Sequence, residues 1–251
     1  MERWRGKVAV VTGASAGIGE AICEQLVNFG LNVVGLARRK ELVEEIARKL
    51  QRGTNTGKLY AYKADVSKEE DILEAFRWIT ENVGPVHILV NNAGIMRPGG
   101  LLDGTSDGWK DIFDTNVLGL CVATREAIKI MRAHSIDGHV VHINSISGHT
   151  IEYFPNLNVY PASKFAVTAL TETLRQELNS VGSKIKITSI SPTGVDTEIN
   201  ENGGLVYPPE MMAVKDTLRL LDSKDVADAV CYVLGTPPHV QVHELIIRSL
   251  Q

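Results

Sequence analysis

The chain has 251 residues, of which 44% are hydrophobic and 22% are charged, values that are ordinary for a globular protein. The net charge of −4 excludes the basic surface that nucleic-acid binding needs, and the sequence has no apolar run long enough to predict a membrane span. The cysteines Cys23, Cys121 and Cys231 lie far apart and form no C-x-x-C motif, so neither a disulfide framework nor a metal site is expected. We therefore expect a cytoplasmic protein with reduced cysteines and no bound metal.

Short apolar runs alternate with helical patterns along the chain, without a composition break or an internal repeat. The predicted strands are Val8–Val11, Val33–Leu36, Leu59–Lys63, Ile88–Asn91, His139–Asn144, Ile185–Ile190 and Val242–Ile247. The predicted helices cover residues 17–29, 40–51, 69–83, 107–133, 159–180 and 223–235. Most of the strands are continuous apolar runs, which is typical of strands covered on both faces. The alternation predicts one Rossmann-like, doubly wound α/β domain over residues 1–251, with a parallel sheet of about seven strands.

A glycine-rich turn joins the first predicted strand to the first predicted helix. Its spacing is G-x-x-x-G-x-G, which differs from the usual G-x-G-x-x-G fingerprint. Glycine allows a sharp turn and lets backbone N–H groups approach a pyrophosphate at the start of the helix. A turn without a ligand is the alternative, but its place after the first strand favours dinucleotide binding. The cofactor contacts expected here are Gly13, Ser15, Gly17, Ile18 and Gly19.

The end of the second predicted strand lacks the acidic residue that holds the ribose 2′-hydroxyl of NAD. Ala37 takes that place, and Arg38 and Arg39 follow it. Guanidinium groups suit a 2′-phosphate through charge and fork geometry, so we predict NADP (NADPH) as the cofactor, with Arg38 as the preferred contact. The alternative is that both arginines merely begin a solvated helix.

Polar segments also follow the third and fourth predicted strands. After the third strand, Asp65 can accept a hydrogen bond from the adenine amine, with Val66 beside it. The alternative for Asp65 is a helix N-cap, although Ser67 suits that position better. After the fourth strand, the polar turn Asn92-Ala93-Gly94 is expected at the same edge of the sheet, although by composition alone it could be any turn. Its assignment to the cofactor depends on the family resemblance given below.

Asn116 lies on or beside the apolar stripe of the predicted helix 107–133, together with Phe113, Val117 and Leu120. A buried amide needs hydrogen-bond partners. The simplest account of this residue is a structural hydrogen bond to a neighbouring backbone group.

Tyr160 and Lys164 share one face of the predicted helix 159–180, because they are four residues apart. A neighbouring ammonium group stabilises phenolate, so the pair predicts a lowered pKa for Tyr160 and a usable proton donor near neutral pH. With a dinucleotide site in the same chain, the pair indicates an oxidoreductase.

These segments, in this order, resemble the short-chain dehydrogenase/reductase superfamily over essentially the whole chain. The matching segments are Thr12–Gly19, Asn91–Gly94, Asn116, Ile143–Ser145, Tyr160–Lys164 and Ser191–Pro192. The stretches Met1–Trp4, Ile143–His149 and Leu170–Leu178 further resemble the NADP-dependent farnesol dehydrogenases of insects and a related vertebrate carbonyl reductase.

The resemblance implies a catalytic tetrad of Asn116, Ser145, Tyr160 and Lys164. In that tetrad Tyr160 exchanges a proton with the substrate, Ser145 stabilises the substrate oxygen, and Lys164 supports the tyrosine and binds the nicotinamide ribose. It also implies a backbone distortion at Asn116 and an ordered water between there and Lys164. Ser147 is the alternative to Ser145. A non-catalytic dinucleotide sensor, the competing class, would be expected to have lost one of the reacting groups.

The resemblance also places the segment after the sixth predicted strand at the cofactor, through Pro192, Val195 and Thr197. It implies that the backbone around Val195 meets the nicotinamide carboxamide and that Thr197 reaches the phosphates. Thr193 stands where the family usually has glycine. This departure bears on the local turn and leaves the tetrad unchanged.

The residues expected to wall the substrate site are apolar and adaptable, and none is an arginine that could hold a carboxylate. They are Met96, Ile151, Tyr153, Phe154, Leu157, Tyr207, Met211 and Met212. Ordinary packing is the alternative for any one of them. Together they favour a small lipophilic alcohol or ketone, and the resemblance suggests farnesol, another terpenoid alcohol or a steroid-type carbonyl. Residues 198–216 interrupt the strand–helix alternation and are the predicted substrate loop.

The apolar, alanine-containing faces of the predicted helices 107–133 and 159–180 indicate pairing with a second copy of the chain. The resemblance likewise implies a homodimer or homotetramer.

Overall fold

The structure is a computed structural model, and it describes residues 1–51, 57–151, 156–199 and 219–250. Its strands are β1 (Val8–Thr12), β2 (Asn32–Ala37), β3 (Lys58–Lys63), β4 (Val86–Asn91), β5 (His139–Ile143), β6 (Lys186–Pro192) and β7 (Glu244–Ile247). Its α-helices are α1 (Gly17–Asn28), α2 (Lys40–Leu50), α3 (Glu69–Asn82), α4 (Ser106–Phe113), α5 (Gly119–Ala133), α6 (Tyr160–Ser180) and α9 (Ser223–Gly235). Short 3-10 helices are η1 (Glu2–Trp4) and η3 (Ile146–Gly148), and η2 (Asp114–Leu118) is a π-helical segment.

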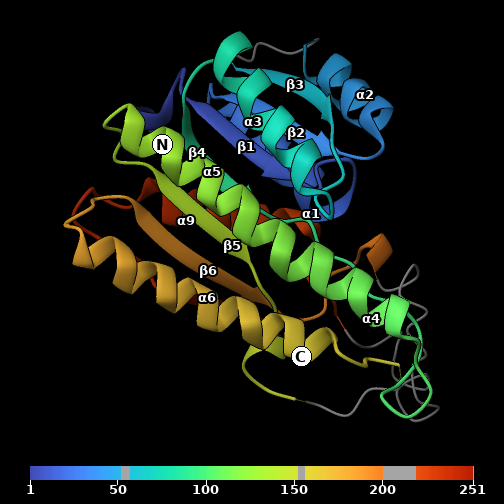
Figure 1. The fold of residues 1–251 in the computed structure, drawn as a ribbon. Coiled ribbons are helices and arrows are strands. Elements are labelled where there is room, and N and C mark those ends of the chain that lie inside the picture. The colour runs from blue at the N-terminus through green and yellow to red at the C-terminus, as the bar shows by residue number, and fades with distance from the viewer. Residues whose placement is uncertain (52–56, 152–155, 200–218, 251) are drawn as a thin grey trace.

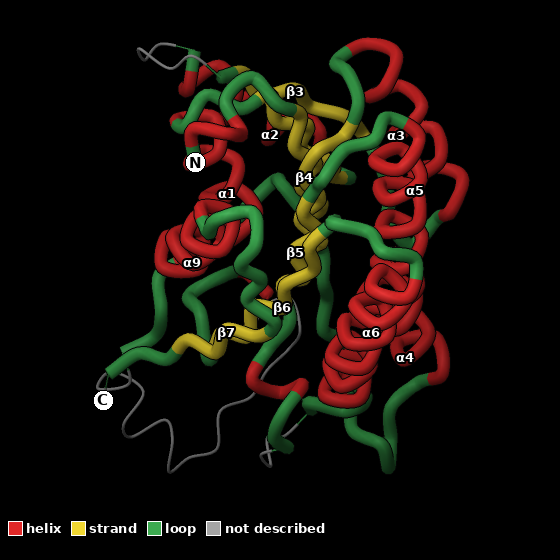
Figure 2. Tube along the Cα trace, turned by 90° about the vertical axis from the view of Figure 1, so that its left-hand side faces the viewer, coloured by secondary structure: helices red, strands yellow, loops and turns green. Residues whose placement is uncertain are grey.

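Helices cover both faces of one parallel sheet, whose strand order is β3-β2-β1-β4-β5-β6-β7 (Figures 1 and 2). On one face α1, α2 and α9 bury apolar side chains such as Ile22, Val43 and Val230 against the strands. On the other face α3, α5 and α6 bury side chains that include Phe76 and Met131. Each fully buried side chain of this size contributes about 1.5–3 kcal/mol by leaving water. The predicted doubly wound α/β fold is thus confirmed.

The strand order reverses between β1 and β4, and this reversal decides where a ligand can bind. β1 pairs with β2 on one side and with β4 on the other, both in parallel. The loops that leave the carboxyl ends of β1 and β4 therefore depart in opposite directions and open a crevice. The polar segments predicted to follow the strands gather at this edge.

One predicted helix differs from the structure. The segment predicted as a single helix over residues 107–133 is divided into α4, the π-helical segment η2 and α5. A π-helical turn takes one extra residue per turn and is commonly found at functional sites. The other predicted elements begin and end within about two residues of the observed ones, which is the normal scatter of such boundaries. Among the described residues, no helix is both long and apolar enough to cross a membrane.

Candidate active site

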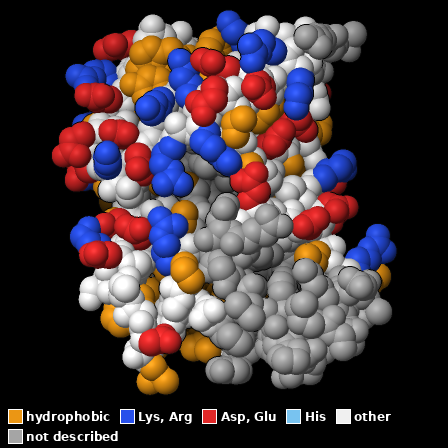
Figure 3. Space-filling model, turned by 90° about the vertical axis from the view of Figure 1, so that its right-hand side faces the viewer, with side chains coloured by type: hydrophobic (Ala, Val, Ile, Leu, Met, Phe, Trp, Pro, Cys, Tyr) orange, Lys and Arg blue, Asp and Glu red, His pale blue; other side chains and the backbone are white. Residues whose placement is uncertain are grey.

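A cavity of about 900 Å³ lies at the carboxyl edge of the sheet. The predicted site residues that line it are Gly13, Ser15, Gly17, Ile18, Arg38, Arg39, Asp65, Val66, Asn92, Ala93, Gly94, Met96, Ser145, Leu157, Tyr160, Lys164, Pro192, Val195 and Thr197. They come from segments far apart in the chain, which only the parallel sheet brings to one edge. Acidic and basic side chains are mixed over this side of the molecule in Figure 3, and neither sign dominates it.

The glycine turn after β1 leaves no room for a side chain at Gly13 or at Gly19. Gly13 has a φ of +68°, and a Cβ there would lie 2.9 Å from the Cα of Ala93. A Cβ on Gly19 would lie only 2.2 Å from the carbonyl oxygen of Gly13. Gly19 therefore packs closely beneath the turn. Its expected contact with the cofactor stays a prediction.

The residues at this turn fit the phosphates of a dinucleotide. Ala16, the N-cap of α1, offers no side-chain hydrogen bond, so the N–H groups of the first turn stay available to an anion. The Thr197 hydroxyl oxygen is buried and has no hydrogen-bond partner among the described residues. The same side chain lies beside the turn, where a Cβ on Gly17 would approach the Thr197 methyl to 3.2 Å. The N–H groups of the helix start and the Thr197 hydroxyl therefore lie close together and can both bind a pyrophosphate.

The two arginines after β2 lie in different surroundings. A nitrogen of the Arg39 guanidinium donates to a carboxylate oxygen of Glu198 at 3.0 Å and to the Ser15 hydroxyl at 3.4 Å. Arg38 lines the same cavity and has no ion-pair partner within the described part of the chain. Ala37 is buried at the end of β2 and supplies no acid. Of these two arginines, Arg38 is therefore the one that is better placed to bind a phosphate.

Asp65 has a local structural role as well as a place in the cavity wall. One of its carboxylate oxygens accepts hydrogen bonds from the Ser67 backbone N–H at 3.1 Å and from the Ser67 hydroxyl at 2.8 Å. The N-cap of α3 is Lys68, so Ser67 does not take the capping position expected for it. The predicted contact with adenine stays a prediction.

Tyr160 is the first residue of α6, and Lys164 follows one turn later. The Lys164 ammonium lies 5.7 Å from the centre of the Tyr160 ring and donates a hydrogen bond to the carbonyl oxygen of Ile143 at 3.0 Å. Burial lowers the pKa of Lys164 to about 8. Burial also raises the pKa of Tyr160 to about 12, against the opposing effect of a hydrogen bond with Ser145. The expected lowering of the Tyr160 pKa is thus wrong for this structure, because the lysine binds the β5 carbonyl and desolvation dominates.

The hydroxyl group beside the phenol is that of Ser145. The Ser145 hydroxyl lies near enough to lower the pKa of the Tyr160 phenol, and its oxygen accepts from the backbone N–H of Ser147 at 3.1 Å. Both serines line the cavity. Ser145 therefore stays the preferred catalytic serine, and Ser147 stays the alternative.

Asn116 lies inside the π-helical segment with only 2% of its surface exposed. Its side-chain oxygen accepts from the Ile95 N–H at 2.8 Å, and its side-chain nitrogen donates to the Ile95 carbonyl at 3.0 Å and to the Ser163 hydroxyl at 3.1 Å. These bonds tie the loop after β4 to α6. They match the structural role expected for a buried amide, and Asn116 does not line the cavity. The ordered water toward Lys164 stays a prediction.

The substrate wall differs in part from the expected apolar set. Met96 and Leu157 line the cavity, whereas Ile151 is 75% exposed and does not. The expected residues Tyr153, Phe154, Tyr207, Met211 and Met212, and most of the predicted loop 198–216, lie outside the described residues. Three arginines that the sequence argument did not count among the walls also line the cavity: Arg97, Arg219 and Arg248. Arg248 directly follows β7, and its position at the carboxyl end of a predicted strand was the available signal.

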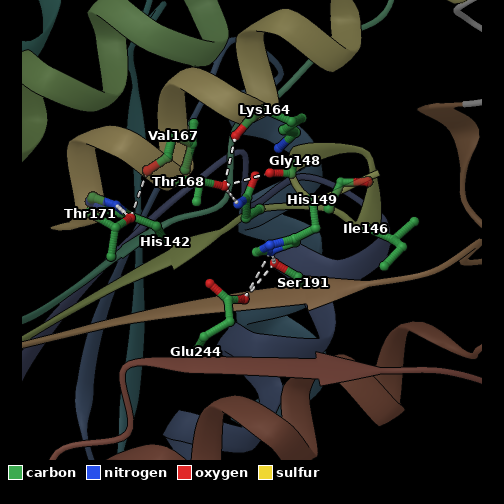
Figure 4. Close-up of polar contacts among 12 residues, drawn as sticks. His142, Ile146, Gly148, His149, Lys164, Val167, Thr168, Thr171, Ser191 and Glu244 are labelled. Atoms are coloured by element: carbon green, nitrogen blue, oxygen red, sulfur yellow. Dashed lines mark hydrogen bonds and ion pairs between the residues drawn. The ribbon is translucent and has the colours of Figure 1, made fainter. Parts of the chain in front are cut away.

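A histidine and a glutamate that the sequence reasoning missed lie behind the serines. The Ser191 hydroxyl donates to a carboxylate oxygen of Glu244 at 2.6 Å and lies 2.9 Å from the Nε2 of His149 (Figure 4). Because the hydroxyl proton of Ser191 goes to the carboxylate, the hydroxyl oxygen accepts from His149. This chain of bonds joins the segment after β5 to β6 and β7.

Comparison with known proteins agrees with this geometry. A family model described as short chain dehydrogenase matches residues 7–204. The chain is 52% identical over 252 residues to a farnesol dehydrogenase of Aedes aegypti, across 100% of this chain and 98% of the relative. It is 45% identical over 252 residues to dehydrogenase/reductase SDR family member 11 of Bos taurus, across 100% of this chain and 99% of the relative. The solved structure of an alcohol dehydrogenase from the archaeon Thermococcus sibiricus, complexed with 5-hydroxy-NADP, matches with a TM-score of 0.84 at 27% identity, over 98% of this chain and 97% of that one.

Proposed function

Because the chain belongs to the short-chain dehydrogenase family of oxidoreductases, we propose that it interconverts a lipophilic alcohol and its aldehyde or ketone with NADP(H). The observation that carries the proposal is the place of the Ser145 hydroxyl beside the Tyr160 phenol, near enough to lower the pKa of the phenol, at the wall of the large cavity and with Lys164 one helical turn away. Two hydroxyl groups at one point can share a single substrate oxygen.

The side chains then have separate tasks. Tyr160 gives a proton to the carbonyl oxygen in reduction and takes one from the alcohol in oxidation. Ser145 donates a hydrogen bond to the same oxygen and stabilises the charge that develops there. Lys164 holds a positive charge beneath the phenol while its ammonium is anchored to the Ile143 carbonyl. A bound nicotinamide cofactor supplies or accepts the hydride.

NADP is proposed over NAD on the charges after β2. Arg38 lines the cavity, and Ala37 stands where an acid would hold the 2′-hydroxyl of NAD. Arg38 has no ion-pair partner among the described residues, and a guanidinium group suits a 2′-phosphate through charge and through paired hydrogen bonds. The neighbouring Arg39 is already engaged by Glu198.

The substrate class rests on the relatives and on part of the wall. The Aedes aegypti relative is named a farnesol dehydrogenase, and Met96 and Leu157 supply apolar surface to the cavity. We propose farnesol or another terpenoid alcohol as the substrate. A broad carbonyl or steroid-type ketone reductase is the second candidate, favoured by the arginines Arg97 and Arg248 in the same wall, which can bind polar groups of a ketone. A non-catalytic NADPH sensor would not need the Ser145–Tyr160–Lys164 arrangement, which is intact in this chain.

A substrate screen tests the proposal. Purified protein is mixed with farnesol and NADP or NAD, and separately with a panel of aldehydes and ketones and NADPH, while the absorbance of the reduced nicotinamide is followed. Farnesol oxidation with a preference for NADP supports the proposal. Turnover of ketones alone supports the second candidate, and tight NADPH binding without turnover of any compound supports the sensor.

The proposal includes a homodimer or homotetramer. The apolar side chains of Phe113, Leu118 and Phe165 are 36%, 57% and 39% exposed on the neighbouring elements α4, η2 and α6 (Figure 1). Such a patch on a soluble chain is typical of an interface. Light scattering at micromolar concentration should give a mass of two or four chains, and a monomer would contradict the proposal.

A further inference from the structure

One face of α6 carries Tyr160, Lys164 and Thr168, each four residues after the last. All three side chains contact the same short stretch of chain, which runs from the last residue of β5 to Gly148. Tyr160 lies beside the Ser145 hydroxyl, which lowers the pKa of the phenol, and Lys164 donates to the carbonyl of Ile143. Thr168 completes this series, although it does not line the cavity.

Thr168 binds both ends of the serine-bearing turn, which we define as residues 144–148. Its hydroxyl oxygen accepts from the side-chain nitrogen of Asn144 at 2.8 Å. The hydroxyl proton goes to the carbonyl oxygen of Gly148 at 3.0 Å, with the Lys164 carbonyl a more distant acceptor at 3.3 Å (Figure 4). A hydroxyl has one proton to donate, so accepting from Asn144 and donating to Gly148 sets its orientation.

The backbone of the serine-bearing turn lies directly against the backbone of α6 at Gly148. A Cβ on Gly148 would lie 2.8 Å from the Lys164 carbonyl oxygen and 2.8 Å from the Asn144 side-chain nitrogen. Asn144 is 3% exposed, and its nitrogen has no other acceptor among the hydrogen bonds of the described residues. Removing the Thr168 hydroxyl would therefore leave a buried donor and a backbone acceptor unpaired, and the turn would be free to move away from the helix.

The other side of the serine-bearing turn is held independently. His149, directly after the turn, lies 2.9 Å from the hydroxyl of Ser191, which donates to Glu244. This link fixes the turn to β6 and β7 but not to α6. The position of Ser145 relative to Tyr160 depends on the contact with α6.

We propose that Thr168 is a positioning residue of the active site, whose hydroxyl holds the serine-bearing turn against α6 so that Ser145 and Tyr160 meet at one substrate oxygen. This inference rests on the proposed function of those two residues. Thr168 touches neither substrate nor cofactor and acts through the turn. A displacement of about 1 Å at a reacting group can reduce turnover about a hundredfold.

The test compares Thr168→Val, which keeps the branched shape and removes the hydroxyl, with Thr168→Ser, which keeps the hydroxyl. Thr168→Val should lower kcat about tenfold to a hundredfold with little change in the KM for substrate or in NADPH affinity, and Thr168→Ser should restore most of kcat. Thr168→Ala removes the hydroxyl without placing a methyl group against the Gly148 carbonyl, and it should behave as Thr168→Val does. If the valine variant fails to fold, Thr168→Ala replaces it in the comparison with Thr168→Ser.

Thr171→Val is the matched control. The Thr171 hydroxyl is also buried on α6, where it lies 2.9 Å from the Nδ1 of His142 and donates to the Val167 carbonyl at 2.8 Å (Figure 4). Its bonds do not involve the serine-bearing turn, so its loss should lower stability and leave kcat near the wild-type value. Equal loss of kcat in the Thr168 and Thr171 variants would overturn the proposal.

Amide hydrogen exchange provides a readout that does not require turnover. The N–H groups of Ser147, Gly148 and the following His149 donate hydrogen bonds to acceptors in the turn, at 3.1, 2.9 and 2.9 Å. Thr168→Val should speed exchange at these positions and not in the interior of α6. If wild-type protein turns over no substrate, the proposed function fails, and the exchange comparison alone then decides the role of Thr168. Unchanged exchange at the turn would overturn it in either case.

Discussion

The ammonium of Lys164 lies 5.7 Å from the centre of the Tyr160 ring and is bonded to the backbone of β5, not to the phenol. The lysine is 6% exposed, and burial lowers its pKa to about 8. Burial raises the pKa of the Tyr160 phenol to about 12. Each group is thus shifted toward its neutral form, as desolvation requires. Additional positive charge near the phenol, such as an oxidised nicotinamide ring, would favour its ionisation.

The buried lysine should leave a signature in stability at alkaline pH. The folded-state pKa of Lys164, about 8, lies below its ordinary value of 10.5, so between these pH values the unfolded chain binds more protons at this group. Its contribution to the free energy of unfolding therefore rises with pH across that window, by roughly 3 kcal/mol at most. In urea titrations, the wild-type free energy minus that of Lys164→Met should increase over this range. A Lys224→Met variant, at an exposed lysine whose pKa is raised, should show no such increase, and a flat difference for Lys164→Met would contradict the assignment.

Replacing Tyr160 by phenylalanine should remove the proton donor and little else. We expect a loss of turnover of about 10²- to 10⁴-fold, the range typical of a general acid. NADPH affinity, measured by fluorescence titration, should stay close to wild type. Tyr62→Phe is the control, because Tyr62 packs against Trp78 on the opposite part of the domain and should tolerate the change. Substantial turnover by Tyr160→Phe would refute the proton-transfer role.

The two arginines after β2 should differ in their effect on cofactor choice. Arg38→Ala should weaken NADP binding about tenfold or more, the cost of a charged hydrogen bond, and leave NAD binding almost unchanged. Arg39→Ala should have the smaller effect, because its guanidinium is bound to Glu198. The dissociation constants of NADP and NAD, measured for the wild type and for both variants, test this difference. An equal loss of NADP and NAD affinity in Arg38→Ala would reject a contact with the 2′-phosphate.

Asn116 should be worth more to stability than its side-chain size suggests. Asn116→Ala removes three hydrogen bonds and takes their Asn116 partner from the partly buried N–H and carbonyl of Ile95. We expect the free energy of unfolding to fall by about 2 to 4 kcal/mol. Asn82→Ala breaks a hydrogen bond to the Trp78 carbonyl at an exposed position and should cost less than about 0.5 kcal/mol. Similar small losses in both variants would contradict the structural role of Asn116.

Features that depend on neighbours in the chain could be predicted from the sequence. The glycine turn, the pair Arg38 and Arg39, and the spacing of Tyr160 and Lys164 each follow from a few consecutive residues. The strands could be located because buried parallel strands are continuous apolar runs. The interruption of helix 107–133 could not be located by periodicity, because the partner that holds Asn116 is Ile95, 21 residues earlier.

What the sequence by itself determined is the order of the elements, the glycine-rich turn and the place of Tyr160 and Lys164 on one face of a helix. These depend on local backbone preference and on the period of apolar residues. Only the tertiary structure decided the direction of the Tyr160 pKa shift, the bonds between Asn116 and Ile95 and the bond between Thr168 and Gly148. Each of these depends on how much water and which distant groups surround an atom, and a packed chain sets both by contacts between residues far apart in the sequence.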